Sequence, residues 1–211
     1  YEVKICKGFR SLDGTAYELN RAERIVGLWP RVIAFLVISL LLSAYSTYIG
    51  VGQESLSKYI YDVSSGQFAA MKGLFGIGQV IQGVIKTALF MFFSAIIFWI
   101  FTDLEFRKLL VVQLFPTAVY LAEKIVLLPL RFYFGIDTVS SPFSFGVIAQ
   151  YIFNNEWMHH FFAMISIFAI WFIYIQYRYL IKISDKSKKV IFSIVIFTNL
   201  FIWLFASLFS Y

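Results

Sequence analysis

The chain has 211 residues, of which 60% are hydrophobic, 20% aromatic and only 14% charged, and its formal net charge is +6. Soluble domains are typically about 45–50% apolar and about 25% charged, so this composition excludes an ordinary soluble enzyme, a DNA-binding module and a secreted disulfide scaffold. A single cysteine, Cys6, permits no internal disulfide and no cysteine-based zinc site. We therefore expect an all-α polytopic membrane helix bundle.

The apolar residues are gathered in runs rather than spread along the chain. Residues 1–31 are polar and of mixed charge, which predicts a cytoplasmic leader, and 32–211 form the membrane domain. A helix needs about 20 predominantly apolar residues to cross the hydrocarbon core. Runs close to this length predict five membrane helices, at 32–50, 84–101, 109–130, 159–177 and 190–210.

The lysines and arginines predict the orientation of these five helices. With the N-terminus inside, the inner segments hold 13 Lys and Arg residues and the outer connectors hold 3. Cytoplasmic loops carry the excess of basic residues in membrane proteins. We therefore expect a cytoplasmic N-terminus and an external C-terminus.

The two outer connectors, 51–83 and 131–158, are long and partly apolar. In the first, apolar residues recur at roughly helical spacing among Lys58, Asp62 and Lys72. They are Ile60, Val63, Phe68, Met71, Leu74 and Phe75. This pattern suits a short helix in the membrane interface, and residues 142–155 of the second connector look similar; an ordinary external loop is the alternative. We expect the glycines at 73, 76, 78 and 83 to ease a turn into the second span.

The third predicted span carries a polar stripe. Its members are Gln113, Thr117, Tyr120, Lys124 and Arg131, with Glu123 near one edge. At about 100° per residue the first five fall within about 60° of one another around a helix. Polar groups in hydrocarbon are costly without partners, so the stripe should face the bundle interior, a water-filled crevice or another subunit. Pro116 should kink the helix near Thr117. A shorter set of polar residues, Gln79, Gln82 and Lys86, precedes and enters the second span.

No catalytic or metal-binding pattern is visible. His159 and His160 follow Glu156, but adjacent histidines point to different faces and no further ligand has a suitable spacing, so an interfacial anchor is the better interpretation. Glu123 is the only acid inside a predicted span, which leaves an aspartyl-type membrane protease without its second acid. We expect a protein that is not an enzyme and that has no cofactor and no metal.

The order of the segments resembles that of the Yip family of multi-span membrane proteins. The resemblance rests on a polar leader, five helices, a charged turn after the second helix and a proline-containing third helix, with residues 101–130, FTDLEFRKLLVVQLFPTAVYLAEKIVLLPL, as the matching stretch. The acidic and Gly-Tyr motifs of the eukaryotic members are not evident. The Ile-, Phe- and Lys-rich texture is typical of a bacterium of low genomic GC, which predicts a location in the bacterial plasma membrane.

Some bacterial Yip-domain proteins accompany MacB-type ABC exporters that act on antimicrobial peptides. The resemblance therefore implies a non-catalytic accessory subunit that supports such an exporter, in antimicrobial peptide or toxin export or resistance. Its implied partners are membrane lipid and other membrane subunits, such as an ABC permease, an ATPase and a periplasmic-adaptor-like subunit, but no nucleic acid. In this reading the polar stripe packs helices or docks a partner. The alternative is a small membrane carrier or channel that uses the stripe as a path.

Overall fold

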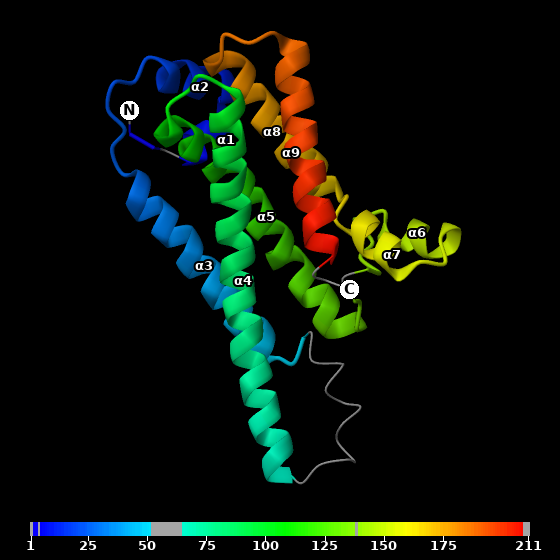
Figure 1. The fold of residues 1–211 in the computed structure, drawn as a ribbon. Coiled ribbons are helices and arrows are strands. Elements are labelled where there is room, and N and C mark those ends of the chain that lie inside the picture. Colours follow the sequence, from blue (N-terminus) through cyan, green and yellow to red (C-terminus); the bar gives the residue numbers. More distant parts are fainter. Residues whose placement is uncertain (1, 4, 52–64, 138, 209–211) are drawn as a thin grey trace.

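The computed structural model describes residues 2–3, 5–51, 65–137 and 139–208, and the described residues form an all-α fold (Figure 1). Its helices are α1 (Ile5–Arg10), α2 (Leu12–Asn20), α3 (Leu28–Tyr48), α4 (Ser65–Phe101), α5 (Phe106–Phe134), α6 (Gly146–Ile152), α7 (Glu156–Ala163), α8 (Ile167–Ile183) and α9 (Lys188–Leu208). The predicted fold class is therefore confirmed.

Among the described residues, four helices are long and apolar enough to cross a membrane: α3, the stretch Gly66–Phe101 of α4, α5 and α9. The predicted fourth span differs from the structure. Residues 159–177 are divided between α7 and α8, because the chain breaks at 164–166 and the Ser166 side chain accepts a hydrogen bond from the Ala169 amide to begin α8. With 17 residues, α8 is about 25 Å long, at the short end of membrane-spanning helices.

The helices α3, α4, α5, α8 and α9 run alternately up and down (Figure 1). The leader is folded, and its helix α2 packs on α8 while α1 contacts α5. The α4–α5 turn and the α8–α9 loop lie at the same end of the bundle as the leader, where Lys108 donates to the Asn20 carbonyl (3.1 Å) and Lys186 pairs with Asp103 (3.0 Å). The three segments predicted to lie on the inner side are thus neighbours in space. The orientation relative to a membrane stays a prediction.

Helix α4 is continuous for 37 residues, which corresponds to about 55 Å. The predicted interfacial helix followed by a turn is therefore wrong from Ser65 onward; Ile60 and Val63, with Lys58 and Asp62, lie outside the described residues. Two of the glycines instead let α4 approach α3, because a Cβ at Gly76 would lie 2.8 Å from the Thr47 methyl group and one at Gly83 would lie 2.8 Å from Cβ of Ser43. Small residues have this role in many membrane helix pairs.

The second connector contains the two short helices α6 and α7, which pack on each other and project from the side of the bundle (Figure 1). Their hairpin is fixed to the start of α8 by backbone hydrogen bonds from Phe145 to Ile165 (3.1 Å) and from Ile167 to Phe143 (3.0 Å). The short segment expected within residues 142–155 is therefore helical as α6, whereas most of α7 belongs to the predicted fourth span. Their place in a membrane interface stays a prediction.

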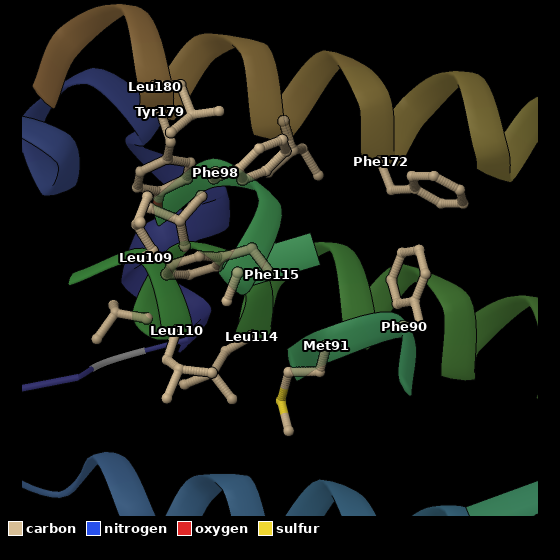
Figure 2. Packing of buried hydrophobic residues seen from close by; sticks show 14 of the residues in the cluster. Phe90, Met91, Phe98, Leu109, Leu110, Leu114, Phe115, Phe172, Tyr179 and Leu180 are labelled. Atoms are coloured by element: carbon tan, nitrogen blue, oxygen red, sulfur yellow. The ribbon is translucent and has the colours of Figure 1, made fainter. Parts of the chain in front are cut away.

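The core is built around α5, whose residues 109–117 are all buried. A helix that is apolar on all sides is buried on all sides, and α5 contacts α3, α4 and α8. Large side chains fill the space between α4, α5 and α8 (Figure 2), where the rings of Phe115 and Tyr179 stack at 4.7 Å and those of Phe90 and Phe172 meet edge to face at 5.1 Å. The helix is unbroken at Pro116 and Pro129.

Candidate functional site

The polar stripe of α5 is divided by the structure into two parts with different surroundings. Gln113 and Thr117 are fully buried, whereas Tyr120, Glu123, Lys124 and Arg131 are only partly covered. The stripe residues therefore share one face of α5, as predicted, but lie in two different environments.

The buried part belongs to a chain of three amide side chains, which we call the amide chain: Gln113 of α5, Gln176 of α8 and Asn199 of α9. The Asn199 amide donates to the Gln176 oxygen (2.7 Å), and the Gln176 amide donates to the Gln113 oxygen (3.0 Å). All three residues are 0% exposed. Hydrogen bonds of this kind hold membrane helices together, so the amide chain connects α5, α8 and α9 in the apolar interior.

Both ends of the amide chain have an unused polar atom. The Gln113 Nε2 group and the Asn199 Oδ1 atom are buried without a hydrogen-bond partner among the described residues. Thr117 does not extend the chain to another helix, because its hydroxyl donates to the Gln113 carbonyl of its own helix (2.7 Å). Among the described residues, the side-chain hydrogen bonds of Gln113 and Thr117 thus run to α8 and within α5 itself.

Gln176 and Asn199 were not among the predicted site residues. Each lies within a predominantly apolar run, and neither forms a polar stripe along its helix. The available signal was the type of side chain, since an amide in an apolar membrane segment is expected to find a partner on another helix.

The outer part of the stripe is charged, and a lysine of α4 lies near it. The Lys124 ammonium lies over the Tyr120 ring, 4.6 Å from its centroid, and Tyr120 packs against Phe90 of α4 at 5.4 Å. Lys86, one turn before Phe90 on α4, is close enough to Lys124 and Arg131 to interact electrostatically. We call Lys86, Lys124 and Arg131 the cation cluster.

Glu123 is the acid of this region. Its carboxylate is close enough to the Ser166 side chain at the start of α8, and to Arg131 and Lys124, to interact with all three. The structure thus brings together four of the predicted stripe residues and Lys86. The two other polar residues near the second span do not join them: Gln79 bonds to Thr47 (3.0 Å) and to the Val51 carbonyl (3.0 Å), and Gln82 is exposed.

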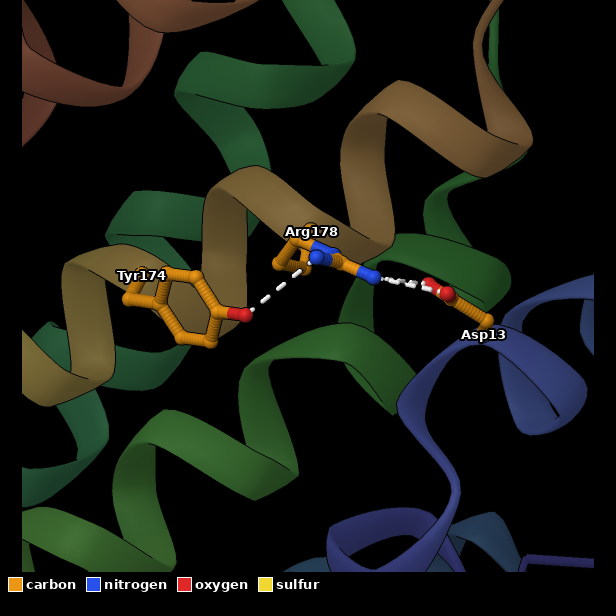
Figure 3. Close-up of polar contacts among 3 residues, drawn as sticks. All are labelled: Asp13, Tyr174 and Arg178. Carbon is orange, nitrogen blue, oxygen red and sulfur yellow. Dashed lines mark hydrogen bonds and ion pairs between the residues drawn. The ribbon is translucent and has the colours of Figure 1, made fainter.

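The opposite end of the bundle presents a polar surface, which we call the leader face: α1, α2, the α4–α5 turn and the α8–α9 loop. Arg178 of α8 donates to both carboxylate oxygens of Asp13 on α2 (2.8 and 2.6 Å) and to the Tyr174 hydroxyl (3.3 Å), as Figure 3 shows. The hydrogen bond from Arg178 lowers the pKa of Asp13 below its ordinary value. Both partners remain partly exposed to solvent.

The leader also contains a groove of about 580 Å³, lined by Glu2, Lys7, Tyr17, Glu18, Arg21, Ala22 and Glu23. Lys7 pairs with Glu18 across it (2.6 Å), and the Arg21 guanidinium lies over the Tyr17 ring at 4.4 Å. The groove carries charges of both signs, so it suits a polar protein segment better than an apolar ligand.

His159 makes a hydrogen bond within its own part of the chain. The His159 Nε2 atom hydrogen-bonds the Phe153 carbonyl (2.7 Å) and links α7 to the end of α6. Within the part of the chain that the structure describes, no three His, Cys, Asp or Glu residues gather into a possible metal site.

One protein family matches this chain. The family described as Permease MlaE matches residues 17–101, from within α2 to the end of α4, which is less than half of the chain. No curated protein and no solved structure matches it. The match meets the segment used for the Yip resemblance only at Phe101, so that resemblance stays a prediction. The chain is a multi-pass membrane protein, consistent with a bacterial plasma membrane, and over α2–α4 it is similar to a membrane permease.

Proposed function

We propose that this protein is a non-catalytic membrane subunit of an ABC-type transporter and that an ATPase subunit docks on its leader face. The observation that carries the proposal is the convergence of three charged segments, far apart in sequence, on one end of the bundle. The match to a permease over residues 17–101 supports it, because that segment runs from the leader into the bundle. MlaE is a permease component of an ABC transporter.

The chemistry of the leader face suits a soluble partner. The α4–α5 turn presents the exposed residues Asp103 and Glu105, the first turn of α5 presents Arg107, and the groove of the leader lies at the same end. Charged groups at a protein interface control which partner binds and how fast. A partner that supplies ATP hydrolysis from another chain fits this arrangement.

Charge reversal at the leader face tests the proposal. We expect an ATPase subunit to co-purify in mild detergent with the unchanged protein, and Arg107→Glu to reduce its recovery about tenfold or more, because like charges across an interface are strongly unfavourable. Lys72→Glu is the matched control, since Lys72 is also exposed but lies near the far end of α4. Absence of any ATPase from the unchanged protein, or equal loss in both variants, contradicts the proposal.

The resemblance to the Yip family supports a narrower form of this function: an accessory role in the export of antimicrobial peptides or toxins. The measurement is growth of a strain that lacks the gene in the presence of such peptides. We expect increased sensitivity that is restored by the intact gene. Unchanged sensitivity rules out this narrower function and leaves the subunit role in place.

A small carrier or channel is the second candidate, and the charged outer part of the α5 stripe favours it. Lys86 of α4 interacts electrostatically with Lys124 of α5, and Glu123 interacts with Lys124 and Arg131 of its own helix. If these groups conduct, the double change Glu123→Gln and Lys124→Gln should abolish flux of the transported ion in liposomes that contain the purified protein. Flux that survives the double change excludes the stripe as a path.

A further inference from the structure

Helix α6 buries its small residues and exposes its large apolar ones. Its buried residues are Gly146 and Ala149, and a Cβ at Gly146 would lie 3.0 Å from that of Ala163 on α7. The large side chains of α6 and its N-cap are between 46% and 89% exposed: Phe145, Ile148, Tyr151 and Ile152. A helix on the surface of a soluble domain has the opposite arrangement, and a contiguous exposed apolar patch marks a surface that contacts a partner or a membrane.

The segment that contains α6 carries no charge. Residues 138–155 include no Asp, Glu, Lys or Arg, and charged residues appear only on either side, at Asp137 and Glu156. One polar side chain of α6, that of Gln150, donates within the segment to the Ser140 hydroxyl (3.3 Å). Protein surfaces in water are usually rich in charged residues, so the exposed side of α6 has the chemistry of a surface in contact with lipid.

The α6–α7 hairpin is attached to the bundle near the far membrane surface, which we define as the one opposite the leader face. Its backbone hydrogen bonds join the start of α8, where Ser166 is close enough to Glu123 of α5 to interact with it. Glu123 follows Phe106, the first residue of α5, by 17 positions, which correspond to about 26 Å at 1.5 Å per residue. The charged α4–α5 turn lies outside the hydrocarbon core, because charges within it are costly, and the core is about 30 Å thick. The attachment point therefore lies just inside the far boundary of the core. Lys124 of the cation cluster is at the same level, where a lysine side chain can reach the headgroups.

The chain turns back toward the membrane after α5 ends. Phe134, the last residue of α5, follows Phe106 by 28 positions, or about 42 Å, which is beyond the core. The amide of Phe145 nevertheless bonds to the Ile165 carbonyl at the start of α8 (3.1 Å). Figure 1 accordingly shows α6 and α7 beside the lower half of α5, projecting sideways, rather than beyond its end. Lipid surrounds a membrane bundle on its sides, so a sideways projection at this level enters the bilayer.

We propose that α6 lies in the far leaflet, at the boundary between headgroups and acyl chains, and that its exposed face binds lipid. Ile148 and Ile152 contact the acyl chains, and Tyr151 lies nearer the headgroups, where tyrosine is enriched in membrane proteins. Helices of this kind bury their apolar face about 5–10 Å into that boundary. The proposal requires only that the bundle crosses a membrane, and it depends neither on an ATPase partner nor on a transported substrate.

Spin labels on single cysteines test the position of α6. Cys6 is the only cysteine of the chain, so Cys6→Ser provides a background for Ile148→Cys and Ile152→Cys. The labelled full-length protein is placed in liposomes of phosphatidylcholine and phosphatidylglycerol. The measurement is the collision rate of each label with oxygen, which concentrates in lipid, and with a water-soluble nickel chelate.

Two further positions calibrate the measurement. Leu41→Cys on α3 is the matched lipid-facing control, because Leu41 is 60% exposed and Ile152 is 66% exposed; its protection from nickel also shows that the chain is folded and inserted. Asp185→Cys in the α8–α9 loop is the water-facing control. We expect the oxygen-to-nickel ratio at Ile148 and Ile152 to match that at Leu41 and to exceed that at Asp185 severalfold.

Two results overturn the proposal. Collision with nickel at Ile148 and Ile152 that is as frequent as at Asp185 places α6 in water. Rare collision with both reagents means that protein covers the face, either a second copy of the chain or another part of it. Tyr151→Cys adds a test of depth: nickel should reach a label there more often than at Ile152, and the reverse order contradicts the assigned position of Tyr151 near the headgroups.

Discussion

Two contact regions of the bundle hold helices together by opposite means. Between α3 and α4 the contact is made of small residues, which we call the hydroxyl seam: Ser39, Ser43 and Thr47 of α3 with Gly76, Gly83 and Thr87 of α4. Between α5, α8 and α9 long amides reach across a space filled with aromatic rings. The first region depends on the absence of side chains and the second on their length, so the two should respond differently to substitution.

The largest expected effect comes from filling the hydroxyl seam. Gly83→Leu places a Cβ 2.8 Å from that of Ser43, an atom attached directly to the backbone that has little freedom to move. Overpacking of this kind costs about 2–3 kcal/mol, measured as the free energy of unfolding in detergent and denaturant. Gly78→Leu is the matched control, because nothing lies within 4 Å of a Cβ there. Equal stability of the two variants would show that α3 and α4 are not in close contact.

Removal of one amide tests the second region. Gln176→Leu keeps the approximate size of the side chain but breaks two interhelical hydrogen bonds and leaves the Gln113 oxygen and the Asn199 amide with fewer partners. Interhelical hydrogen bonds in membranes contribute about 0.6 kcal/mol on average and up to about 1.7, so we expect a loss of about 1–2 kcal/mol. The exposed Gln82→Leu should lose none. A Gln176 variant as stable as the original protein would make the amide chain incidental.

The two regions also differ in how far sequence predicted them. The polar stripe of α5 follows from periodicity, because Gln113 and Thr117 recur on one helix face. Gln176 and Asn199 could not be paired with it, since contacts between distant helices depend on packing that no local pattern encodes. In the hydroxyl seam the glycines suggested a turn, and only the position of α3 shows that Gly76 and Gly83 are sites of close approach.

The same distinction holds for the fold as a whole. Composition and apolar runs predicted an all-α membrane bundle, and the charge pattern predicted which segments share one end. The break at 164–166 was missed because the residues on both sides of Ser166 are apolar, and hydropathy does not register a capping side chain. The course of the leader along α8 was missed because its ion pair joins residues 165 positions apart, Asp13 and Arg178.

A smaller loss of stability is expected when a hydrogen bond of the hydroxyl seam is removed and its close packing is kept. The Ser39 hydroxyl lies 2.7 Å from that of Thr87 and 3.1 Å from the Gly83 carbonyl on the other helix. Ser39→Ala should cost about 0.6 kcal/mol, the average for such bonds, in the same unfolding measurement. Ser94→Ala is the control, because the Ser94 hydroxyl donates only to the Phe90 carbonyl of its own helix. A loss as large as that of Gly83→Leu would mean that the hydroxyls rather than the glycines hold the seam.

The smallest effect is expected at the contact between α8 and the leader, where Arg178 pairs with Asp13. Because Arg178 lowers the pKa of Asp13, the carboxylate contributes stability that is fully present above its ordinary pKa of 3.8 and is lost as the pH falls through the lowered value. Asp13→Asn should therefore unfold at a slightly lower temperature than the original protein at pH 6, and the difference should become smaller as the pH falls below 3.8. Asp185→Asn, which removes an exposed acid at the same end of the bundle, is the matched control. A difference for Asp13→Asn that does not change as the pH falls would mean that the carboxylate contributes through packing, and that α2 is held on α8 by its buried residues alone.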